Sequence, residues 1–333
     1  MDPNLKPFRQ SEITFGFERE LSSQYVFSVR YSRKNVDSAT EDHGILGANF
    51  SENYIISNPG EGKAAELDKE AGYIKDIKPQ RLYNGVEFVL NKRFSHNYFY
   101  NVNYTWSRLY GNYSGLASSD ENGRTSPGVT RYFDYIVNGF TFTGEPDNGL
   151  LATDRTHTFK AYGGYDFNWR GSKTNTTEIS FFQQILQGTP QTTYMGIQNS
   201  DIVFSKRGDL GRTPTLWQTD LSLSHKYKFG KDSRYTVEFN VNVLNLFNNN
   251  AVTQVNATEW RYAQNNIVGF SDIDPDYSDN PVNAFNAILS GQFPPSKVDE
   301  LLTADDNPRS VLYGQPSNYQ AARNVRFGMR FFF

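Results

Sequence analysis

The feature that most constrains this chain is an apolar–polar alternation with a period of two residues. From Trp217 to Phe229 the odd-numbered positions are mainly apolar or aromatic and the even-numbered positions are all polar. Side chains of a β-strand point to opposite faces in turn, so this pattern predicts a strand with one apolar and one polar face. The same alternation resumes from Tyr235 to Val243, after the turn-forming sequence Gly230-Lys231-Asp232-Ser233. The two segments are therefore predicted to form a β-hairpin.

The alternation recurs along the whole chain and predicts nine strands, around residues 13–17, 25–31, 82–90, 98–106, 157–167, 177–185, 217–229, 235–243 and 325–333. Short turns are expected at Glu20–Ser23 and near residues 96, 171 and 232. Long segments rich in Gly, Asn, Asp, Ser and Pro separate the others, at 35–80, 112–152, 195–211 and 249–321. Alternating short and long connections are typical of outer-membrane β-barrels, and antiparallel pairing would place all the long connections at one end.

Strand length separates a membrane barrel from a soluble β-sandwich. The segment 213–229 has about 17 residues, which at roughly 3.3 Å per residue and ~45° tilt climbs about 40 Å. That exceeds a hydrocarbon core of ~30 Å, whereas sandwich strands usually have about 3–10 residues. The sequence therefore predicts an all-β, antiparallel transmembrane barrel with short periplasmic turns and long extracellular loops.

The alternation also assigns residues to the two faces of this barrel. Polar positions expected to face a water-filled lumen are Asp220, Lys226, Lys228, Glu238, Asn240, Arg326 and Arg330, and apolar positions expected to face lipid are Leu221, Leu223, Val237, Phe239, Val241, Phe327 and Met329. Aromatic residues near the strand ends are expected at the membrane interfaces. Trp106, Tyr110 and Trp217 would lie at one interface, and Tyr227, Phe229 and Tyr235 at the other.

Composition excludes several other classes of protein. The chain has 33 Lys and Arg against 36 Asp and Glu, which gives no basic footprint for nucleic acid. It has no cysteine, so disulfides, zinc–thiolate sites, iron–sulfur clusters and cysteine nucleophiles are excluded. Its four histidines are dispersed, and no nucleophile-elbow or phosphate-loop motif stands in a strand–turn–helix context. We therefore expect neither an enzyme nor a bound cofactor.

Two features of the segment 249–321 leave alternatives open. Asp272, Asp274 and Asp276 have the spacing that begins a calcium loop, although a solvated acidic loop is the simpler interpretation. Residues 280–290 and 295–302 are expected to form short helices. The first would be capped by Asp279 or Asn280 and carry an apolar face of Val282, Phe285, Ile288 and Leu289. This face would either pack locally within the loop or belong to a folded lid over the pore.

Several motifs resemble a known family. The C-terminal run 325–333, with Phe327, Phe331 and Phe333 at alternate positions, is similar to the terminal strand by which outer-membrane proteins are recognised by their assembly machinery. The element Asn245-Leu246-Phe247-Asn248 and the strand start at 154–159 (D-R-T-H-T-F) resemble those of TonB-dependent outer-membrane transporters. Together with residues 208–214 (G-D-L-G-R-T-P), these motifs resemble the Oar-like subgroup most closely. The resemblance covers most of residues 80–333.

The resemblance implies a 22-stranded transporter barrel with an N-terminal plug and a TonB box. Residues 1–333 show nine strands and no plug, TonB box or signal peptide, so we expect them to be the C-terminal portion of one such barrel domain, with 249–320 as a long extracellular loop. The implied partners are outer-membrane lipid, the barrel-assembly machinery, the TonB complex through an N-terminal region, and a ligand that no motif identifies. The alternatives are a passive porin-like or surface-adhesion barrel, and a complete small barrel with a further strand hidden in a long loop.

Overall fold

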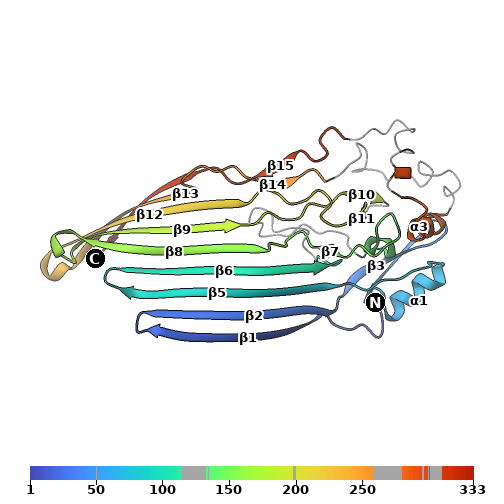
Figure 1. Cartoon of the computed structure of the whole chain (residues 1–333), viewed down its shortest axis with the longest axis horizontal. Coiled ribbons are helices and arrows are strands. Elements are labelled where there is room, and N and C mark those ends of the chain that lie inside the picture. The colour runs from blue at the N-terminus through green and yellow to red at the C-terminus, as the bar shows by residue number, and fades with distance from the viewer. Residues whose placement is uncertain are drawn as a thin grey trace.

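A single antiparallel sheet of nine long strands dominates the molecule (Figure 1). The computed structural model describes residues 1–49, 51–114, 133, 135–197, 200–257, 280–294, 296–298, 300 and 310–333. Strands that follow one another around the sheet are antiparallel neighbours, and a short strand, β7, pairs beside β6. In sheet order the strands are β1 (Arg9–Ser22), β2 (Tyr25–Ser38), β5 (Arg81–Ser95), β6 (Tyr98–Gly111), β8 (His157–Asn168), β9 (Asn175–Leu186), β12 (Leu216–Phe229), β13 (Tyr235–Leu244) and β16 (Asn324–Phe332), and β7 is Gly149–Leu150.

The short turns adopt backbone conformations that suit twisted hairpins. His96 and Asn97, between β5 and β6, both have positive φ, at 53° and 68°. Positive φ at both central residues is the requirement of a type I′ turn, whose twist matches that of the strands it joins. The β8–β9 connection includes η3 (Trp169–Gly171), and the predicted turn after β12 contains η4 (Lys231–Ser233).

Several predicted boundaries were wrong. β2 continues to Ser38, so residues 35–38 belong to a strand and not to the connection 35–80. β1 continues to Ser22, so residues 20–22 belong to the strand and the turn follows at Ser23 and Gln24. β12 has 14 residues rather than about 17, because Thr213 leaves the sheet and its backbone N–H donates to the Thr189 carbonyl at 3.0 Å. Fourteen residues at ~3.3 Å and ~45° tilt still climb about 33 Å, which spans a hydrocarbon core.

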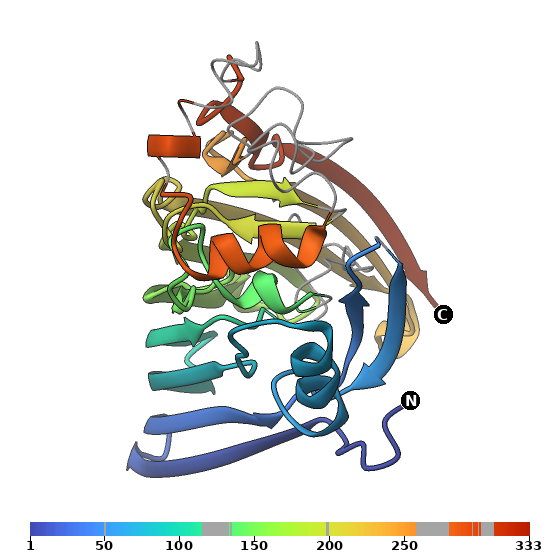
Figure 2. The same ribbon diagram turned by 90° about the vertical axis from the view of Figure 1, so that its right-hand side faces the viewer.

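The nine strands form a curved sheet that is not closed (Figure 2). Within the described residues, β1 pairs only with β2 and β16 pairs only with β13, so both outer edges are unpaired. All four long connections leave the sheet at one end and all four short turns lie at the other, as predicted (Figure 1). We call these the long-connection end and the short-turn end.

The long connections contain secondary structure that was not predicted. The segment 35–80 was expected to be a loop, but it forms a hairpin of β3 (Glu41–Leu46) and β4 (Glu52–Ser57), followed by helix α1 (Gly62–Ala71). Gly72 ends this helix with φ of 98°, and its N–H donates to the Lys69 carbonyl, a C-cap that favours glycine. The other elements are η2 (Ile136–Gly139), β10 (Tyr194–Ile197) paired with β11 (Ser200–Val203), and β14 (Val252–Val255) paired with β15 (Pro316–Tyr319).

The expected helix at 280–290 is present as α3 (Pro281–Leu289), and the Asn280 side chain accepts its first-turn N–H from Val282 at 3.0 Å. Its apolar residues are buried in the main hydrophobic core, where Phe285 contacts the rings of Tyr73 and Tyr135 at centroid distances of 6.1 and 6.0 Å. The apolar face therefore packs against the other long connections rather than only within its own loop, and a role as a lid stays a prediction. The second expected helix, 295–302, lies partly outside the described residues. The largest core of the molecule therefore lies among the connections, at one end of the sheet.

Candidate functional site on the polar face of the sheet

One face of the sheet gathers charged side chains from every part of it. Strand register places Lys226 opposite Glu238, and Glu238 opposite Arg330. Glu238 accepts a hydrogen bond from Ser224 at 2.9 Å and lies 4.0 Å from the Arg330 guanidinium, while Lys226 lies 3.7 Å from Glu178 on β9. By register and alternation the seven predicted lumen residues share this face, which we call the polar face: Asp220, Lys226, Lys228, Glu238, Asn240, Arg326 and Arg330.

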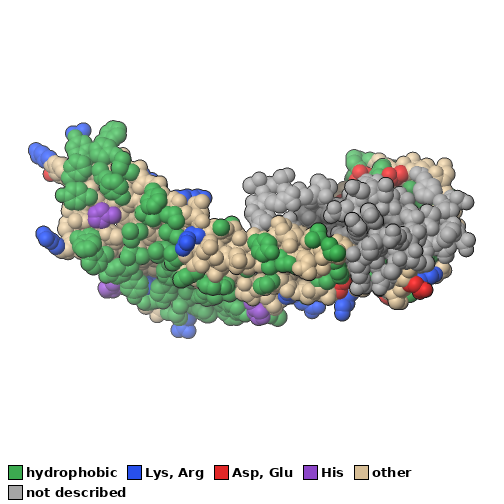
Figure 3. Space-filling view, turned by 90° about the horizontal axis from the view of Figure 1, so that it is seen from above, with side chains coloured by type: hydrophobic (Ala, Val, Ile, Leu, Met, Phe, Trp, Pro, Cys, Tyr) green, Lys and Arg blue, Asp and Glu red, His purple; other side chains and the backbone are tan. Residues whose placement is uncertain are grey.

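The opposite face, which we call the apolar face, exposes large hydrophobic side chains. Phe239 is 54% exposed, Phe327 79% and Met329 69%, although all three lie in the middle of long strands. A sandwich would bury such residues under a second sheet, and no second layer covers them in the part of the chain that the structure describes. Figure 3 shows hydrophobic side chains gathered over the strands, away from the long connections.

The predicted interface aromatics lie at the two ends of this apolar face. Trp106 and Tyr110 are near the long-connection end of β6, and Trp217 contacts Phe247 there at 5.7 Å between ring centroids. Tyr227, Phe229, Tyr235, Phe331 and Phe333 form a chain of ring contacts at the short-turn end, with neighbouring centroids 5.6–6.4 Å apart. Their contact with a membrane interface, and the role of the terminal phenylalanines in assembly, remain predictions.

A groove runs across the polar face near the long-connection end. Its larger part has a volume of about 570 Å³ and is lined by residues of β1, β2, β5 and β6, and a smaller part of about 250 Å³ continues it toward residues 153–158. Tyr83, Thr105 and Leu109 line both parts. The charged lining of the larger part is Glu12, Arg30, Lys34, Arg81 and Glu87.

Most charges in the groove are paired with one another. Lys34 lies 3.3 Å from Glu12, and Arg30 donates to Glu87. The Arg81 side chain makes no hydrogen bond or ion pair to any described residue. A cation that no described residue neutralises, beside two ion pairs, can bind an anionic or hydroxyl-rich solute by charge-assisted hydrogen bonds. Of these residues the periodicity placed only Arg30 and Glu87 on predicted strands, and it gave no sign of a groove.

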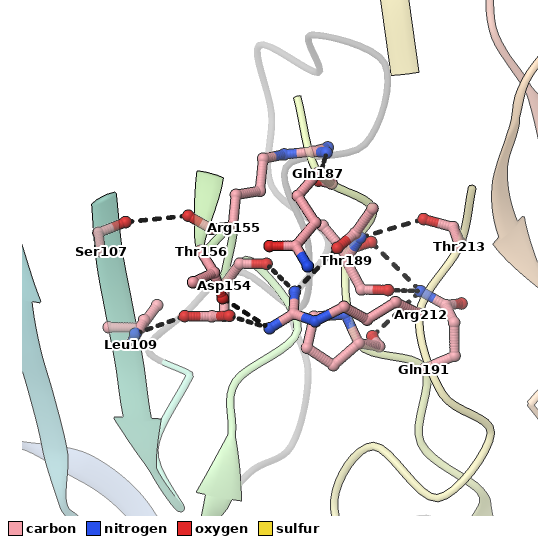
Figure 4. Close-up of polar contacts among 12 residues, drawn as sticks. Ser107, Leu109, Asp154, Arg155, Thr156, Gln187, Thr189, Gln191, Arg212 and Thr213 are labelled. Atoms are coloured by element: carbon pink, nitrogen blue, oxygen red, sulfur yellow. Dashed lines mark hydrogen bonds and ion pairs between the residues drawn. The ribbon is translucent and has the colours of Figure 1, made fainter. Parts of the chain in front are cut away.

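The groove ends at an aspartate–arginine cluster that joins two of the family motifs (Figure 4). Asp154, from the D-R-T-H-T-F motif, is fully buried and forms an ion pair with Arg212, from the G-D-L-G-R-T-P motif. Its other carboxylate oxygen accepts the backbone N–H of Leu109 on β6 at 2.6 Å. Arg212 also donates to the Asp154 carbonyl at 3.0 Å and the Gly188 carbonyl at 2.8 Å.

Neighbouring contacts extend this cluster across four strands. Ser107 on β6 donates to the Arg155 carbonyl at 2.9 Å, and the Arg155 guanidinium donates to the Gln187 carbonyl at 2.6 Å, just after β9 (Figure 4). The cluster thus ties the ends of β6, β8 and β9 to the segment that enters β12. Most donors and acceptors of the cluster form hydrogen bonds to other residues of the chain. Its geometry therefore fits a structural role, in which it fixes the end of the groove, rather than a catalytic one. The sequence analysis identified both motifs but did not predict that they are in contact.

Two further buried ion pairs hold the long connections together. Arg207 donates to the Asp147 carboxylate at 2.6 Å and to the Asn112 carbonyl at 3.0 Å. Burial raises the pKa of Asp147 to about 6, against the opposing effect of Arg207. His43 on β3 contacts Asp68 on α1 through Nε2 at 2.9 Å, and its Nδ1 lies 3.3 Å from the Phe133 carbonyl.

The surroundings of His43 favour its charged form. A carbonyl and a carboxylate are both acceptors, so each ring nitrogen needs a proton to hydrogen-bond. Burial lowers the pKa of His43, but the hydrogen bond and charge of Asp68 raise it more, so that the net pKa lies above 6.5. Sequence analysis treated His43 as one of four dispersed histidines, because Asp68 is 25 residues away.

No cation site is found among the described residues, where no three His, Asp or Glu side chains group as metal ligands. The proposed calcium-loop aspartates, Asp272, Asp274 and Asp276, lie outside the described residues. No described helix has the length and apolar character needed to cross a membrane.

Comparison with known proteins decides the family. The family model described as "outer membrane beta barrel domain" matches residues 1–199, which is more than half of the chain. The chain belongs to the outer-membrane β-barrel family. This barrel chain is also 32% identical, over an alignment of 339 residues, to the TonB-dependent transporter Oar of Myxococcus xanthus. The alignment covers all of the barrel chain but only 29% of that relative's length. The predicted fold class, family resemblance and outer-membrane location are thereby confirmed.

Proposed function

We propose that this barrel chain forms part of the wall of a TonB-dependent transporter and that a polar ligand passes along its polar face. In this arrangement the apolar face contacts outer-membrane lipid and the polar face lines the lumen. The observation that carries the proposal is the groove of about 570 Å³ on the polar face, lined by charges of both signs. The similarity to a TonB-dependent transporter supports the same function.

The partners of this function follow from its physics. Import against a gradient needs energy, which the TonB complex would supply through a part of the protein outside residues 1–333. Phe327 and Phe331 of β16, with Phe333 directly after it, would present the strand to the barrel-assembly machinery. The charged groove favours a ligand with anionic or hydroxyl groups, because Arg81 offers donors that no described residue uses.

The test compares a strain producing the full-length protein with a strain in which its gene is deleted. Depletion of compounds from a defined medium is followed by mass spectrometry, with and without a protonophore. We expect at least one polar compound to be taken up only when both the gene and the proton gradient are present. A double variant in the groove, Arg81→Gln with Lys34→Gln, should slow that uptake, whereas Arg170→Gln with Arg234→Gln in two short turns should not.

The same experiment distinguishes a passive barrel. Uptake that persists with the protonophore, together with steady conductance of the purified full-length protein in planar bilayers, would contradict energised transport and indicate a porin-like protein. Uptake unchanged by gene deletion would contradict both and leave an adhesion or structural role.

A further inference from the structure

The acidic residues of the nine strands are distributed unequally between the two faces of the sheet. By register and alternation, the acidic residues of these strands lie on the polar face, with Asp37 near the end of β2 as the exception: Glu12, Glu18, Glu20, Glu87, Asp166, Glu178, Asp220 and Glu238. Basic residues lie on both faces, and those of the apolar face include Arg33 and Arg108. A cation on such a face is costly unless it has a partner there.

Two of these basic residues stand in one cross-strand row. Arg33 on β2 lies opposite Asn84 on β5, and Asn84 lies opposite Arg108 on β6. Neighbouring strands are about 4.8 Å apart, so the two arginines start from backbones roughly 10 Å apart. Long side chains can converge across that spacing. We call Arg33, Asn84 and Arg108 the arginine row.

The donors of the arginine row are exposed and available. Both arginines are exposed, and neither has an acidic partner among the described residues. The Arg108 guanidinium lies over the Tyr110 ring, 4.7 Å from its centroid, which leaves its edge free to donate. The side-chain Oδ1 of Asn84 accepts a hydrogen bond from the Tyr31 hydroxyl at 3.0 Å, so that its side-chain Nδ2 remains as a donor. The nearby Asp37 is held by Arg9, Ser11 and Asn35.

The position of the row fits a membrane surface. Arg33 lies five residues before the end of β2 and Arg108 three before the end of β6, both at the long-connection end. An arginine on the lipid face costs ~2–4 kcal/mol at mid-membrane and about 0–1 near the interface. Exposed Trp106 and the rings of Tyr31 and Tyr110 lie in the same region, and such amphipathic rings favour the headgroup level.

We propose that the arginine row binds the phosphate of an anionic lipid headgroup, with the acyl chains lying along the apolar face below it. Guanidinium groups bind phosphate oxygens with paired, charge-assisted hydrogen bonds. A lipid fits better than a free anion because exposed apolar side chains continue directly from the row, including Ile13 opposite Arg33 and Phe15 opposite Tyr31. The proposal rests on the proposed function at one point, the contact of the apolar face with lipid.

The test uses the full-length protein in nanodiscs of phosphatidylcholine containing a minor fraction of phosphatidic acid. Retained lipids are counted by native mass spectrometry after release. The variant is Arg33→Gln with Arg108→Gln, and the control is Arg170→Gln with Arg234→Gln, which removes the same charge from two short turns. At about 1 kcal/mol for each basic residue, the row variant should bind phosphatidic acid roughly tenfold or more weakly, and the control should match the parent.

Other results have definite meanings. Equal retention of phosphatidic acid by the row variant and the parent would overturn the proposal, and so would an equal loss in the control. Loss of the bound phosphatidic acid from the parent when inorganic phosphate is added at the concentration of the lipid would identify a general anion site and overturn the lipid assignment. Failure of the parent to enter nanodiscs would contradict the lipid-facing orientation itself, whereas normal entry with no lipid preference would contradict only the arginine row.

Discussion

Arg212 forms an ion pair with the buried carboxylate of Asp154, 58 residues earlier in the chain. Each residue belongs to a separate motif, and their contact joins the strand start of β8 to the segment that enters β12. The same aspartate holds the backbone N–H of Leu109 on β6. This ion pair and its hydrogen bond therefore connect β6, β8 and the segment before β12, which are far apart in the sequence.

Removing either partner of this pair should destabilise the mouth of the groove. Arg212→Gln leaves a buried carboxylate without its cation, and breaking a buried pair in this way costs ~3–5 kcal/mol. We expect this variant of the full-length protein in detergent to unfold at lower denaturant. The double variant with Asp154→Asn should recover part of the loss. Lys226→Gln, which breaks the partly exposed contact with Glu178, should cost below about 1 kcal/mol.

The two faces of β12 should respond differently to the same substitution. Leu223→Arg places a cation on the apolar face and should cost ~2–4 kcal/mol, because hydrocarbon cannot solvate it. Ser222→Arg, one residue away on the polar face, should cost far less. Both are measured by reversible unfolding of the full-length protein in lipid vesicles. Equal costs at the two positions would contradict the membrane orientation and favour a soluble sheet.

The packing of α1 on the β3–β4 hairpin should depend on pH through His43. Its pKa is raised in the folded state, so the stabilisation by the His43–Asp68 pair is fully present below pH 6.5 and is lost as pH rises through the raised value. Hydrogen exchange of residues 41–46 and 62–71 should therefore quicken, after correction for intrinsic rates, as the pH rises.

The control is the His43→Asn variant. In this variant the same residues should exchange faster at low pH than in the parent, and the part of the pH dependence that comes from His43 should be lost. Asp76, whose pKa is raised by burial and by the charge of Asp68, also loses stability as the pH rises, so the comparison with His43→Asn isolates the contribution of the histidine. Unchanged protection across the range would show that folding does not raise the pKa of His43, and protection that increases with pH would show that the histidine is neutral in the folded protein.

Residues 1–333 expressed alone should not form a stable monomer in a membrane. Within the described residues the outer edges of β1 and β16 have no partner strand, and each unpaired N–H or C=O group in hydrocarbon costs several kcal/mol. Refolded in detergent, this segment should show neither heat-modifiable gel mobility nor compact protease resistance. A sharp, SDS-resistant monomer would instead indicate a small complete barrel.

Sequence alone determined the strands, the two faces and the ends of the sheet. Alternation from Trp217 to Phe229 reports which side each residue faces, because a strand's geometry is local and has a fixed period of two. Turn residues such as Asn97 likewise report a local backbone requirement. The same signals gave no warning of helix α1, because it has few apolar residues, of which only Ala64 is buried.

Tertiary structure decided what the alternation does not encode, namely which distant side chains meet. The pairing of Asp154 with Arg212, the burial of His43 against Asp68 and the groove beside Arg81 all join residues from different strands or connections. Face and period are properties of a single segment, whereas these contacts depend on strand stagger and on how the connections fold over the end of the sheet. For this reason the barrel wall could be predicted from the sequence and its candidate site could not.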